Sequence, residues 1–373
     1  MYHPSVPSAT SGFVLELDEV ASLEKSPTER KPMRFTDTDP TLDSYWRAII
    51  LFGRNVASYK FALANALLEI APEERELVKL DELAKPFSRH LCAHLLQTDT
   101  QGTSGASKFL DQCRAFNRGE ISENELIEAT VRRGFNNVID AFHVVAGAET
   151  PERFFIDERR ESGGIRVTDR LFELLDLAQA SNLQHEVEAR WRLVETAWEL
   201  GISKQLIAVQ ADHTGQELYV NAPARRVSVT SARPALSGYQ RGNCFYCGSF
   251  ISADASHTGA GDIDHFFPHI LEAQGLARGL NGVWNLVLAC TECNRGPGGK
   301  FDRVPDLDPF LYRLEARNNY LIESHHPLRE TLIQQTGKTR EARHRFLQRQ
   351  YHQARALLVH RWRPKESPVG LAL

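Results

Sequence analysis

The stretch from Asn243 to Lys300 decides what fold this chain is expected to adopt. It contains NCFYCG at residues 243–248, DIDHFFPH at residues 262–269 and WNLVLACTECNRG at residues 284–296. Two Cys-x-x-Cys pairs thus bracket an Asp-His pair. Each piece has a chemistry of its own, and the three follow one another within one short segment.

The two cysteine pairs, Cys244/Cys247 and Cys290/Cys293, have the spacing of zinc ligands. A tight Cys-x-x-Cys turn presents two soft thiolates to one ion, and a second turn completes a tetrahedron. A redox-active pair and a disulfide are the alternatives. Two pairs in one segment, in a chain whose N-terminus has no secretory pattern, favour zinc over both. Four sulfur ligands leave no open position, so this zinc is expected to be structural.

The residues between the cysteine pairs predict a short hairpin followed by a helix. Apolar Ile263 stands between two aspartates, which is typical of a strand, and Pro268 predicts a turn after it. A second strand or loop is expected at residues 284–288. A helix is then expected to begin near the second cysteine pair.

This order resembles the HNH endonuclease family, whose core is a ββα-metal fold. The family pattern runs Cys-x-x-Cys, Asp-His with a nearby Pro, Asn-Leu-Val, and Cys-x-x-Cys followed by His or Asn. The corresponding residues are Cys244 and Cys247, Asp264, His265 and Pro268, Asn285, Leu286 and Val287, and Cys290, Cys293 and Asn294. The resemblance covers only this stretch and its flanks, but all its features occur in the family order.

The resemblance implies a role for each of these polar residues. His265 would be the general base that accepts a proton from the attacking water. Asp264 and Asn294 would hold one divalent cation, magnesium or manganese, through oxygen ligands. Asn285 would bond to backbone and keep the loop and His265 in position. Taken singly, an Asp-His pair can be a surface hydrogen bond and an Asn a turn residue, so the functional interpretation depends on the combination.

Phosphate contacts are harder to assign. Family members often carry a Lys soon after the last cysteine, whereas here Arg295 comes first and Lys300 follows only after GPGG. Both are candidate nucleic-acid contacts, as is His269. In the C-terminal sequence Arg345 and Arg349 share one helical face, which is either a solvated surface or a contact with the DNA backbone.

Composition is that of an ordinary water-soluble protein. The 373 residues are 42% hydrophobic and 25% charged, with a formal net charge of −4, which is not typical of a generic nucleic-acid binder. Basic residues are instead concentrated after Tyr312. The remaining cysteines, Cys92 and Cys113, are expected to be buried thiols. With no apolar run that could span a membrane, a cytoplasmic location is expected.

We expect a mainly α protein with a small α+β module. The predicted parts are a flexible tail (1–40), an α-helical domain for partner or substrate selection (41–205), a β connector (206–238), a zinc-stabilised HNH domain (239–308) and a basic helical extension (309–373). Helices are predicted at residues 42–70, 73–85, 86–97, 107–118, 123–145, 170–180, 184–200, 309–320, 328–335 and 339–362. Strands are predicted on both sides of residues 213–216 and within RRVSVTS.

The sequence therefore predicts a metal-dependent hydrolase that cleaves phosphodiester bonds in DNA, in the manner of prokaryotic antiviral defence or restriction nucleases. Two alternatives remain open: a zinc-stabilised nucleic-acid-binding protein without catalysis, and an effector nuclease that is silent until a partner activates it. Expected partners are DNA, a further protein of a multi-component defence system, or a second copy of the chain.

Overall fold

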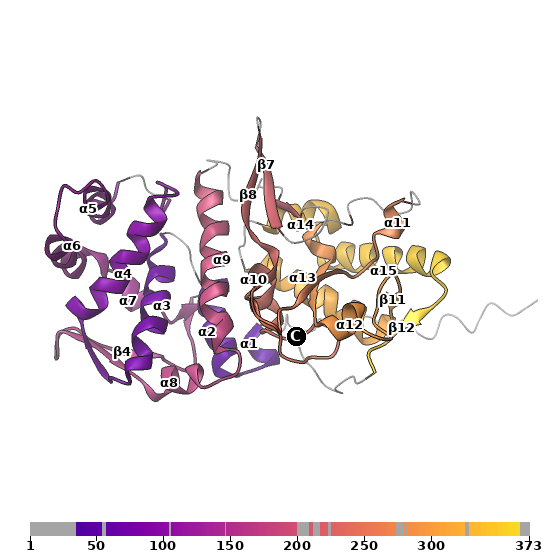
Figure 1. Ribbon diagram of the computed structural model, residues 1–373, viewed down its shortest axis with the longest axis horizontal. Helices are drawn as coiled ribbons and strands as arrows, with labels where there is room; N and C mark the ends of the chain where they lie inside the picture. Colours follow the sequence, from indigo (N-terminus) through magenta and orange to yellow (C-terminus); the bar gives the residue numbers. More distant parts are fainter. Residues whose placement is uncertain are drawn as a thin grey trace, which may run out of the picture. The chain divides into compact units, whose positions relative to one another are not determined.

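Helices make up most of the described chain (Figure 1). The computed structural model describes residues 35–53, 57–103, 106–145, 147–199, 209–211, 217–222, 225–273, 280, 282–324 and 328–365. The strands within these ranges form small sheets, which are antiparallel except for one two-stranded parallel pair. The predicted mainly α class with small β elements is confirmed. No helix in these ranges combines the length and hydrophobicity needed to cross a membrane.

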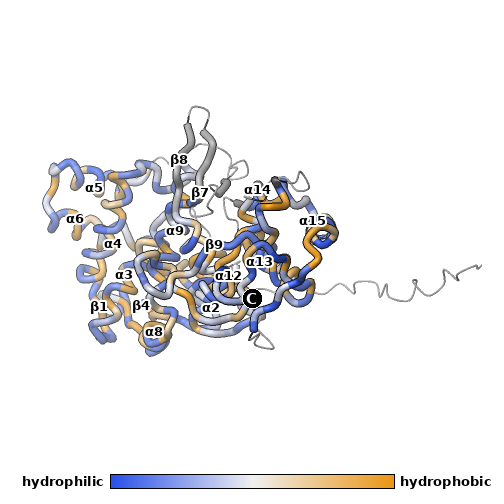
Figure 2. Tube along the Cα trace, turned by 45° about the vertical axis from the view of Figure 1, so that its right-hand side comes forward, coloured by the Kyte–Doolittle hydropathy of each residue, from blue (hydrophilic) through white to orange (hydrophobic). Residues whose placement is uncertain are grey.

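The N-terminal helices pack around a core of aromatic and aliphatic side chains. Trp46, Phe61, Phe87 and Trp191 are among its largest fully buried members. Hydrophobic and hydrophilic segments alternate along these helices (Figure 2), as expected when one face of each is buried. The helices are α2 (Leu42–Phe52), α3 (Tyr59–Ile70), α4 (Leu80–Leu95), α5 (Lys108–Asn117), α6 (Glu123–Ala129), α7 (Val138–Ala141), α8 (Asp169–Leu175) and α9 (Ala180–Glu199).

Two helix boundaries differ from the prediction. The apolar stripe of residues 42–70 is divided at Gly53, where a Cβ would lie 2.4 Å from the carbonyl oxygen of Ile49 and 2.6 Å from Nζ of Lys60. The chain is therefore closely packed at this glycine. The predicted break at Pro86 is wrong, because α4 continues through it. Buried Leu83 and Phe87 hold the helix to the core on both sides of the proline, although one backbone hydrogen bond is lost.

The predicted helix at residues 123–145 is also wrong as a single element. A π turn at Thr130–Gly134 follows α6, and Asn137 has a left-handed φ of 67° before α7 begins. The segment ends in a short hairpin of β2 (Val144–Val145) and β3 (Ala148–Glu149). Asn tolerates the left-handed conformation that interrupts the helix.

A three-stranded sheet beside these helices was not predicted. Its antiparallel order is β1 (Leu77–Lys79), β5 (Gly164–Val167) and β4 (Phe155–Glu158). Gly164 permits the close approach of β1, since a Cβ there would lie 2.2 Å from the carbonyl oxygen of Val78. Strands of three or four residues carry too little sequence pattern to distinguish them from loops.

The predicted β connector is present as β6 (Val209–Ala211), β7 (Glu217–Ala222) and β8 (Arg225–Ser231), paired antiparallel in that order. The expected turn at residues 213–216 lies outside the described residues. After β8 the chain enters α10 (Ala232–Ser237) and then the first cysteine turn.

The predicted hairpin and helix are formed by β9 (Asp262–His265), β10 (Leu286–Ala289) and α12 (Thr291–Arg295). The two strands are antiparallel, with His265 opposite Leu286 and Asp264 opposite Val287. A short helix, α11 (Ile270–Ala273), follows β9. Strand, strand and helix therefore succeed one another in the predicted order.

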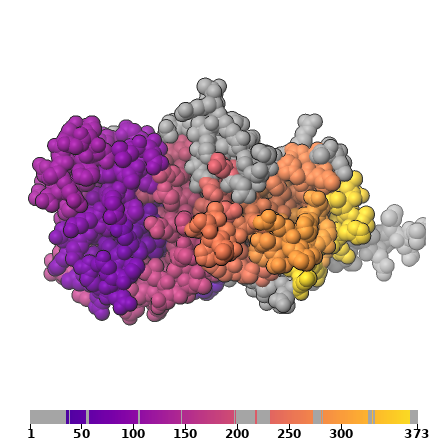
Figure 3. All heavy atoms as spheres, in the orientation of Figure 1, coloured from indigo at the N-terminus to yellow at the C-terminus, as the bar shows by residue number. Residues whose placement is uncertain are grey.

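The C-terminal helices belong to the same hydrophobic core as this hairpin. In Figure 3 the orange atoms of the region around residue 300 lie against the yellow atoms of the C-terminal segment. The last strand returns to pair in parallel with the segment that follows α12. The elements are β11 (Val304–Pro305), α13 (Tyr312–Glu323), α14 (Leu328–Thr336), α15 (Arg340–Leu357) and β12 (Arg361–Trp362).

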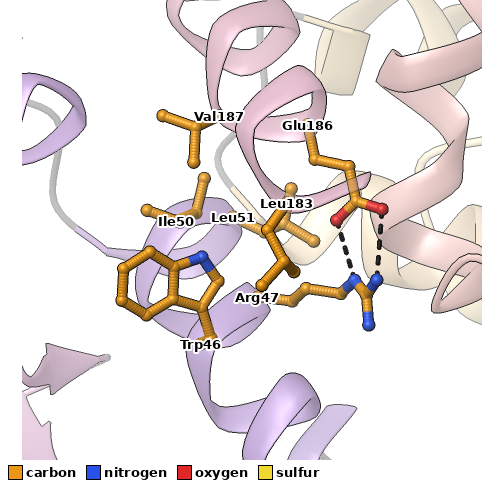
Figure 4. A pocket seen from close by; sticks show the side chains of 7 residues that line it. All are labelled: Trp46, Arg47, Ile50, Leu51, Leu183, Glu186 and Val187. Atoms are coloured by element: carbon orange, nitrogen blue, oxygen red, sulfur yellow. Dashed lines mark hydrogen bonds and ion pairs between the residues drawn. The ribbon is translucent and has the colours of Figure 1, made fainter. Parts of the chain in front are cut away.

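A buried ion pair joins α2 to α9 near the boundary between the two cores (Figure 4). Nε of Arg47 lies 2.8 Å from Oε2 of Glu186, and Arg47 also pairs with Asp43. Ser237 of α10 donates to Oε1 of Glu186 at 2.7 Å. One charged cluster thus connects the helical region with the elements that lead into the cysteine turn.

A helix is present within the last residues of the stretch predicted to be a flexible tail (1–40). Residues 1–34 lie outside the described residues, but α1 (Phe35–Thr38) is a helix. Phe35 is buried, its ring lies 4.3 Å from the Arg241 guanidinium carbon, and its carbonyl accepts a hydrogen bond from Arg241. Phe35 therefore belongs to the core and not to a flexible arm.

Candidate metal centre and active site

The four cysteines converge on one point between the first cysteine turn and the start of α12. Their sulfurs all lie within 4.8 Å of one another, and the Sγ atoms of Cys247 and Cys290 are 3.7 Å apart. Tetrahedral zinc with Zn–S bonds of about 2.3 Å would separate its sulfurs by about 3.8 Å. None of the four forms a disulfide. The cluster could hold a metal ion such as zinc.

Backbone hydrogen bonds shape both cysteine turns. The amide of Cys290 donates to Sγ of Cys244 at 3.3 Å, and that of Cys293 donates to Sγ of Cys290 at 3.4 Å. Gln240 bonds both the amide and the carbonyl of Leu288, at 2.9 Å each. The first turn is thereby fixed to β10, directly before the second cysteine pair.

Asp264 lies in β9, and its side chain is only 8% exposed. Its Oδ1 accepts from Nζ of Lys300 at 3.0 Å, and its Oδ2 accepts from the Tyr246 hydroxyl at 2.5 Å. Burial and the neighbouring Asp264 charge raise the pKa of Tyr246 well above its usual value, so the phenol remains a donor. Both oxygens of Asp264 therefore have a partner from the chain itself.

Asn294 does not bond to Asp264. Its amide donates to Oδ2 of Asp262 at 3.2 Å, and Nε of Arg295 donates to the same oxygen at 3.0 Å. Successive strand residues point to opposite faces, so Asp262 and Asp264 share one face of β9. The acidic face thus has two carboxylates, one paired with α12 and the other with Lys300.

His265 ends β9 and is partly exposed. Its ring centroid lies 4.8 Å from that of His269, and Nδ1 of His269 lies 3.5 Å from a carboxylate oxygen of Glu272. The carbonyl of His265 accepts from Nζ of Lys300 at 2.8 Å. The backbone of the candidate base is thus held by the lysine that also holds Asp264.

Asn285 is fully buried and bonds only to backbone, as the resemblance implies. Its Oδ1 accepts from the amide of Phe267 at 2.8 Å, and its Nδ2 donates to the carbonyls of Phe267 and Leu280, at 2.9 Å each. The two contacts to Phe267 fix the chain immediately after His265. Asn285 therefore acts by holding the loop and does not face the site as a reacting group.

The expected phosphate contacts differ in accessibility. Arg345 and Arg349 are exposed on α15, and the side chain of Arg295 is 64% exposed although it pairs with Asp262. The side chain of Lys300 is 0% exposed. In this conformation the ammonium of Lys300 is enclosed by protein oxygens, so a phosphate contact by Lys300 remains a prediction.

The loop after α12 explains why Lys300 points inward. The amide of Lys300 donates to the carbonyl of Cys293 at 2.7 Å, and that of Phe301 donates to the carbonyl of Asn294 at 3.0 Å. A Cβ on Gly299 would lie 2.9 Å from both the nitrogen and the oxygen of Gly296, so only glycine fits this turn. The GPGG segment therefore folds back along α12 and directs Lys300 beneath the helix.

Sequence reasoning missed Tyr246 and Asp262. Tyr246 occupies one of the two x positions of the first Cys-x-x-Cys pair, and nothing in the sequence places it beside Asp264. Asp262 was detectable, because residues two apart in a strand share a face. The sequence also offered no signal that Lys300 would be buried.

Oxygen donors of the kind that bind magnesium or manganese are present in Asp264, Asp262 and Asn294. Their chemistry suits such an ion, but Asp264 already faces an ammonium and a hydroxyl. Among the described residues, the four cysteines form the one recorded group of three or more Cys, His, Asp or Glu ligands that could hold a metal. The divalent ion predicted at Asp264 and Asn294 therefore remains a prediction.

No protein-family model, curated protein or solved structure matches this chain.

Proposed function

We propose that the chain is a metal-dependent endonuclease of the HNH type, which hydrolyses DNA phosphodiester bonds. One observation carries the proposal: an antiparallel hairpin bearing Asp264 and His265 leads directly into α12, which bears Asn294, with four cysteines joining the ends. A candidate general base, hard oxygen donors and a fixed loop thus occur within one small ββα unit.

In the proposed reaction His265 accepts the proton of a water molecule as its oxygen bonds to phosphorus. The bond from phosphorus to the 3′ oxygen breaks, and that oxygen takes a proton from solvent. Asp264 and Asn294 would hold a divalent ion, which when bound supplies positive charge opposite the phosphate and the leaving oxygen. Asn285 keeps the chain after His265 in place through its two bonds to Phe267.

The biological setting is proposed on the resemblance alone: a prokaryotic antiviral defence or restriction nuclease that acts in the cytoplasm. The helical region would select a partner or substrate. A second copy of the chain would supply the second site needed to cut both DNA strands.

A second candidate is a nuclease that is silent when alone, or a zinc-stabilised DNA-binding protein without catalysis. The ion pair between Lys300 and Asp264 favours it, because the proposed metal ligand is already neutralised by the chain. The plasmid cleavage experiment described next separates these candidates from the stand-alone nuclease.

Supercoiled plasmid incubated with the wild-type protein and magnesium or manganese is expected to be nicked or linearised, with EDTA abolishing the reaction. His265→Ala is expected to lose cleavage by at least about a hundredfold, the usual contribution of a general base. His257→Ala, an exposed histidine in the same module, serves as the matched control and is expected to cleave normally.

Zinc content is measured for each variant, so that loss of the base is distinguished from loss of the fold. An intact plasmid with zinc-loaded wild type would exclude the stand-alone nuclease. Retention of DNA binding under those conditions would then favour the non-catalytic candidate, while cleavage regained with a partner protein would favour the silent effector.

A further inference from the structure

The ammonium of Lys300 occupies a complete oxygen cage inside the candidate site. Its Nζ lies 3.0 Å from Oδ1 of Asp264, 2.8 Å from the carbonyl oxygen of His265 and 3.3 Å from that of Phe301. A lysine ammonium has three donors, and three acceptors surround this one. The side chain is 0% exposed, so protein oxygens take the place of its hydration.

This cage consists of the groups that coordinate a hard cation. Carboxylate and carbonyl oxygens are what magnesium, manganese and calcium bind in proteins. Here one carboxylate and two carbonyls converge on a single positive charge, at the aspartate where the divalent ion is proposed to bind. Lys300 therefore satisfies Asp264 in the way that a bound cation would.

The surrounding loop is built to hold the ammonium there. Besides the backbone bonds of Lys300 and Phe301 to α12, Arg303 donates to the carbonyls of Gly298, Gly299 and Lys300 and closes the turn from the other side. Phe301 has a left-handed φ of 47°, a conformation unfavourable for a residue with a side chain. This strained residue directly follows Lys300, in the turn that places the ammonium beside β9.

We propose that Lys300 is an internal cation that competes with the divalent metal ion for Asp264. The inference deepens the proposed function and rests on it for the identity of the metal site. A divalent ion and an ammonium cannot share one buried carboxylate closely, because like charges a few ångströms apart repel strongly away from water. The lysine must therefore swing away on its flexible stem before the ion binds.

Competition has a measurable consequence. The apparent dissociation constant of the ion equals the intrinsic constant divided by the fraction of molecules whose ligand is free. If Lys300 holds Asp264 in about 90% of molecules, removing its charge tightens metal binding about tenfold. Lys300 is a positioning residue in this scheme, and its effect is read from metal affinity without any cleavage.

The test measures manganese binding to the zinc-loaded full chain, by the spectroscopic signal of free Mn²⁺ in a titration without DNA. Lys300→Gln keeps an amide donor for Asp264 but removes the charge, and is expected to bind Mn²⁺ about tenfold more tightly than wild type. Lys300→Arg keeps the charge and is expected to gain nothing. Lys338→Gln, at an exposed lysine outside the site, is the matched control and is expected to behave as wild type.

Adding Asp264→Asn to Lys300→Gln is expected to remove the gain. A gain that survives this second change would place the ion elsewhere and overturn the inference, as would a folded Lys300→Gln protein that binds Mn²⁺ no more tightly than wild type. The Mn²⁺ titrations give a result even if the wild-type chain cuts no DNA. Failure of the proposed function can therefore be distinguished from failure of this inference.

A second measurement avoids substitution altogether, in case Lys300→Gln does not fold. In ¹⁵N-lysine-labelled wild-type protein, a buried and hydrogen-bonded ammonium gives a resolved signal of its own. Competition predicts that this signal is lost or moves to the solvent-exposed position as Mg²⁺ is added. A signal unchanged at saturating Mg²⁺ would refute displacement of the lysine.

Discussion

The helical region from α2 to α9 and the module from α10 to β11 stabilise their cores in different ways. In the helical region long helices bury rings against one another: the centroids of Phe61 in α3 and Trp191 in α9 are 6.0 Å apart, and so are those of Phe87 in α4 and Phe109 in α5. In the module β9 and β10 have four residues each, β11 has two and α12 has five. Elements this short are unstable in isolation.

The difference shows what each region depends on. Apolar burial is the main stabilising contribution in the helical core, because its helices present continuous hydrophobic faces. The module instead relies on a cysteine cluster and on buried polar clamps such as Gln240 and Asn285. We therefore expect the two regions to respond differently to metal removal, to charge changes and to pH.

The largest effect is expected from the cysteine cluster. Cys290→Ser removes one sulfur ligand and is expected to cost most of the stabilisation that zinc gives small domains, on the order of 10 kcal/mol. Calorimetry should show the module unfolding at low temperature while a transition from the helical region persists. Metal analysis should show zinc lost from the protein.

Cys92→Ser is the matched control, since Cys92 is also buried but lies in the helical core. It is expected to leave the zinc content unchanged. A Cys290→Ser protein that retains stoichiometric zinc and a single transition would contradict the contrast between the two regions.

The next largest effect is expected where the regions meet. Arg47→Met leaves the buried Glu186 without its guanidinium partner, and breaking such a pair costs about 3–5 kcal/mol. Because Glu186 also accepts from Ser237, urea unfolding should show both regions weakened together. The double variant Arg47→Met/Glu186→Met should recover part of the loss.

An exposed pair supplies the comparison. Arg153→Met breaks the surface contact with Glu149 and is expected to cost less than about 1 kcal/mol. If the Arg47 and Arg153 substitutions lower the free energy of unfolding equally, the buried pair between α2 and α9 stabilises the protein no more than an exposed pair does.

A smaller, pH-dependent effect is expected inside the helical core. Burial opposes charge on His94, but hydrogen bonds to Glu188 at 2.9 Å and Glu195 at 2.6 Å outweigh it and raise the pKa of the imidazole. A raised pKa in the folded state means that the stabilisation is complete below the unfolded value of about 6.5 and is lost as pH rises through the folded value. The difference in Tm between wild type and His94→Gln should therefore shrink from pH 6 upward.

His143 provides a contrast of opposite sign in the same region. Burial lowers its pKa to about 3, so the folded ring stays neutral while the unfolded one becomes protonated below about pH 6.5. Its contribution is present above that pH and lost as pH falls toward the folded value. A His143→Gln protein whose Tm difference from wild type grows as pH falls from 6.5 to 4 would contradict this assignment.

The smallest effect is expected on DNA binding by α15. Arg345→Ala and Arg349→Ala should each weaken binding modestly and reduce the slope of log affinity against log salt by about one. Arg132→Ala, an exposed arginine of the helical region, should leave the slope unchanged. If all three variants give the same slope of log affinity against log salt, α15 does not belong to the DNA interface.

Much of the architecture could be predicted from local signals. Cysteine spacing and the apolar residue between two aspartates sufficed for the hairpin, α12 and the metal cluster. The helices with continuous apolar faces were also found. The break predicted at Pro86 was wrong because buried neighbours on both sides offset the backbone hydrogen bond that the proline removes. The β1-β5-β4 sheet was not predicted because its strands are short and pair segments that are distant in the sequence.

The sequence predicts which residues lie together in the hairpin, but not what they contact. The order of Asp264, His265 and Asn285 in the sequence places them on β9 and just before β10, and their roles remain predictions. That Asp264 would face Lys300 and Tyr246 depends on how the GPGG loop and the first cysteine turn fold back, which no local pattern encodes. Burial of an ammonium is a tertiary property, since it requires oxygens from several elements at once.

One feature of α13 bears on how such a protein can evolve. Arg313 donates to the carbonyl of Phe245 in the first cysteine turn, and one turn later Arg317 donates to the carbonyl of Trp284 just before β10. A recombination event that copied only residues 239–308 into another gene would leave both sets of carbonyls without these donors. The transferable unit therefore extends at least through α13, and relatives that exchange this module are expected to carry the helix with it.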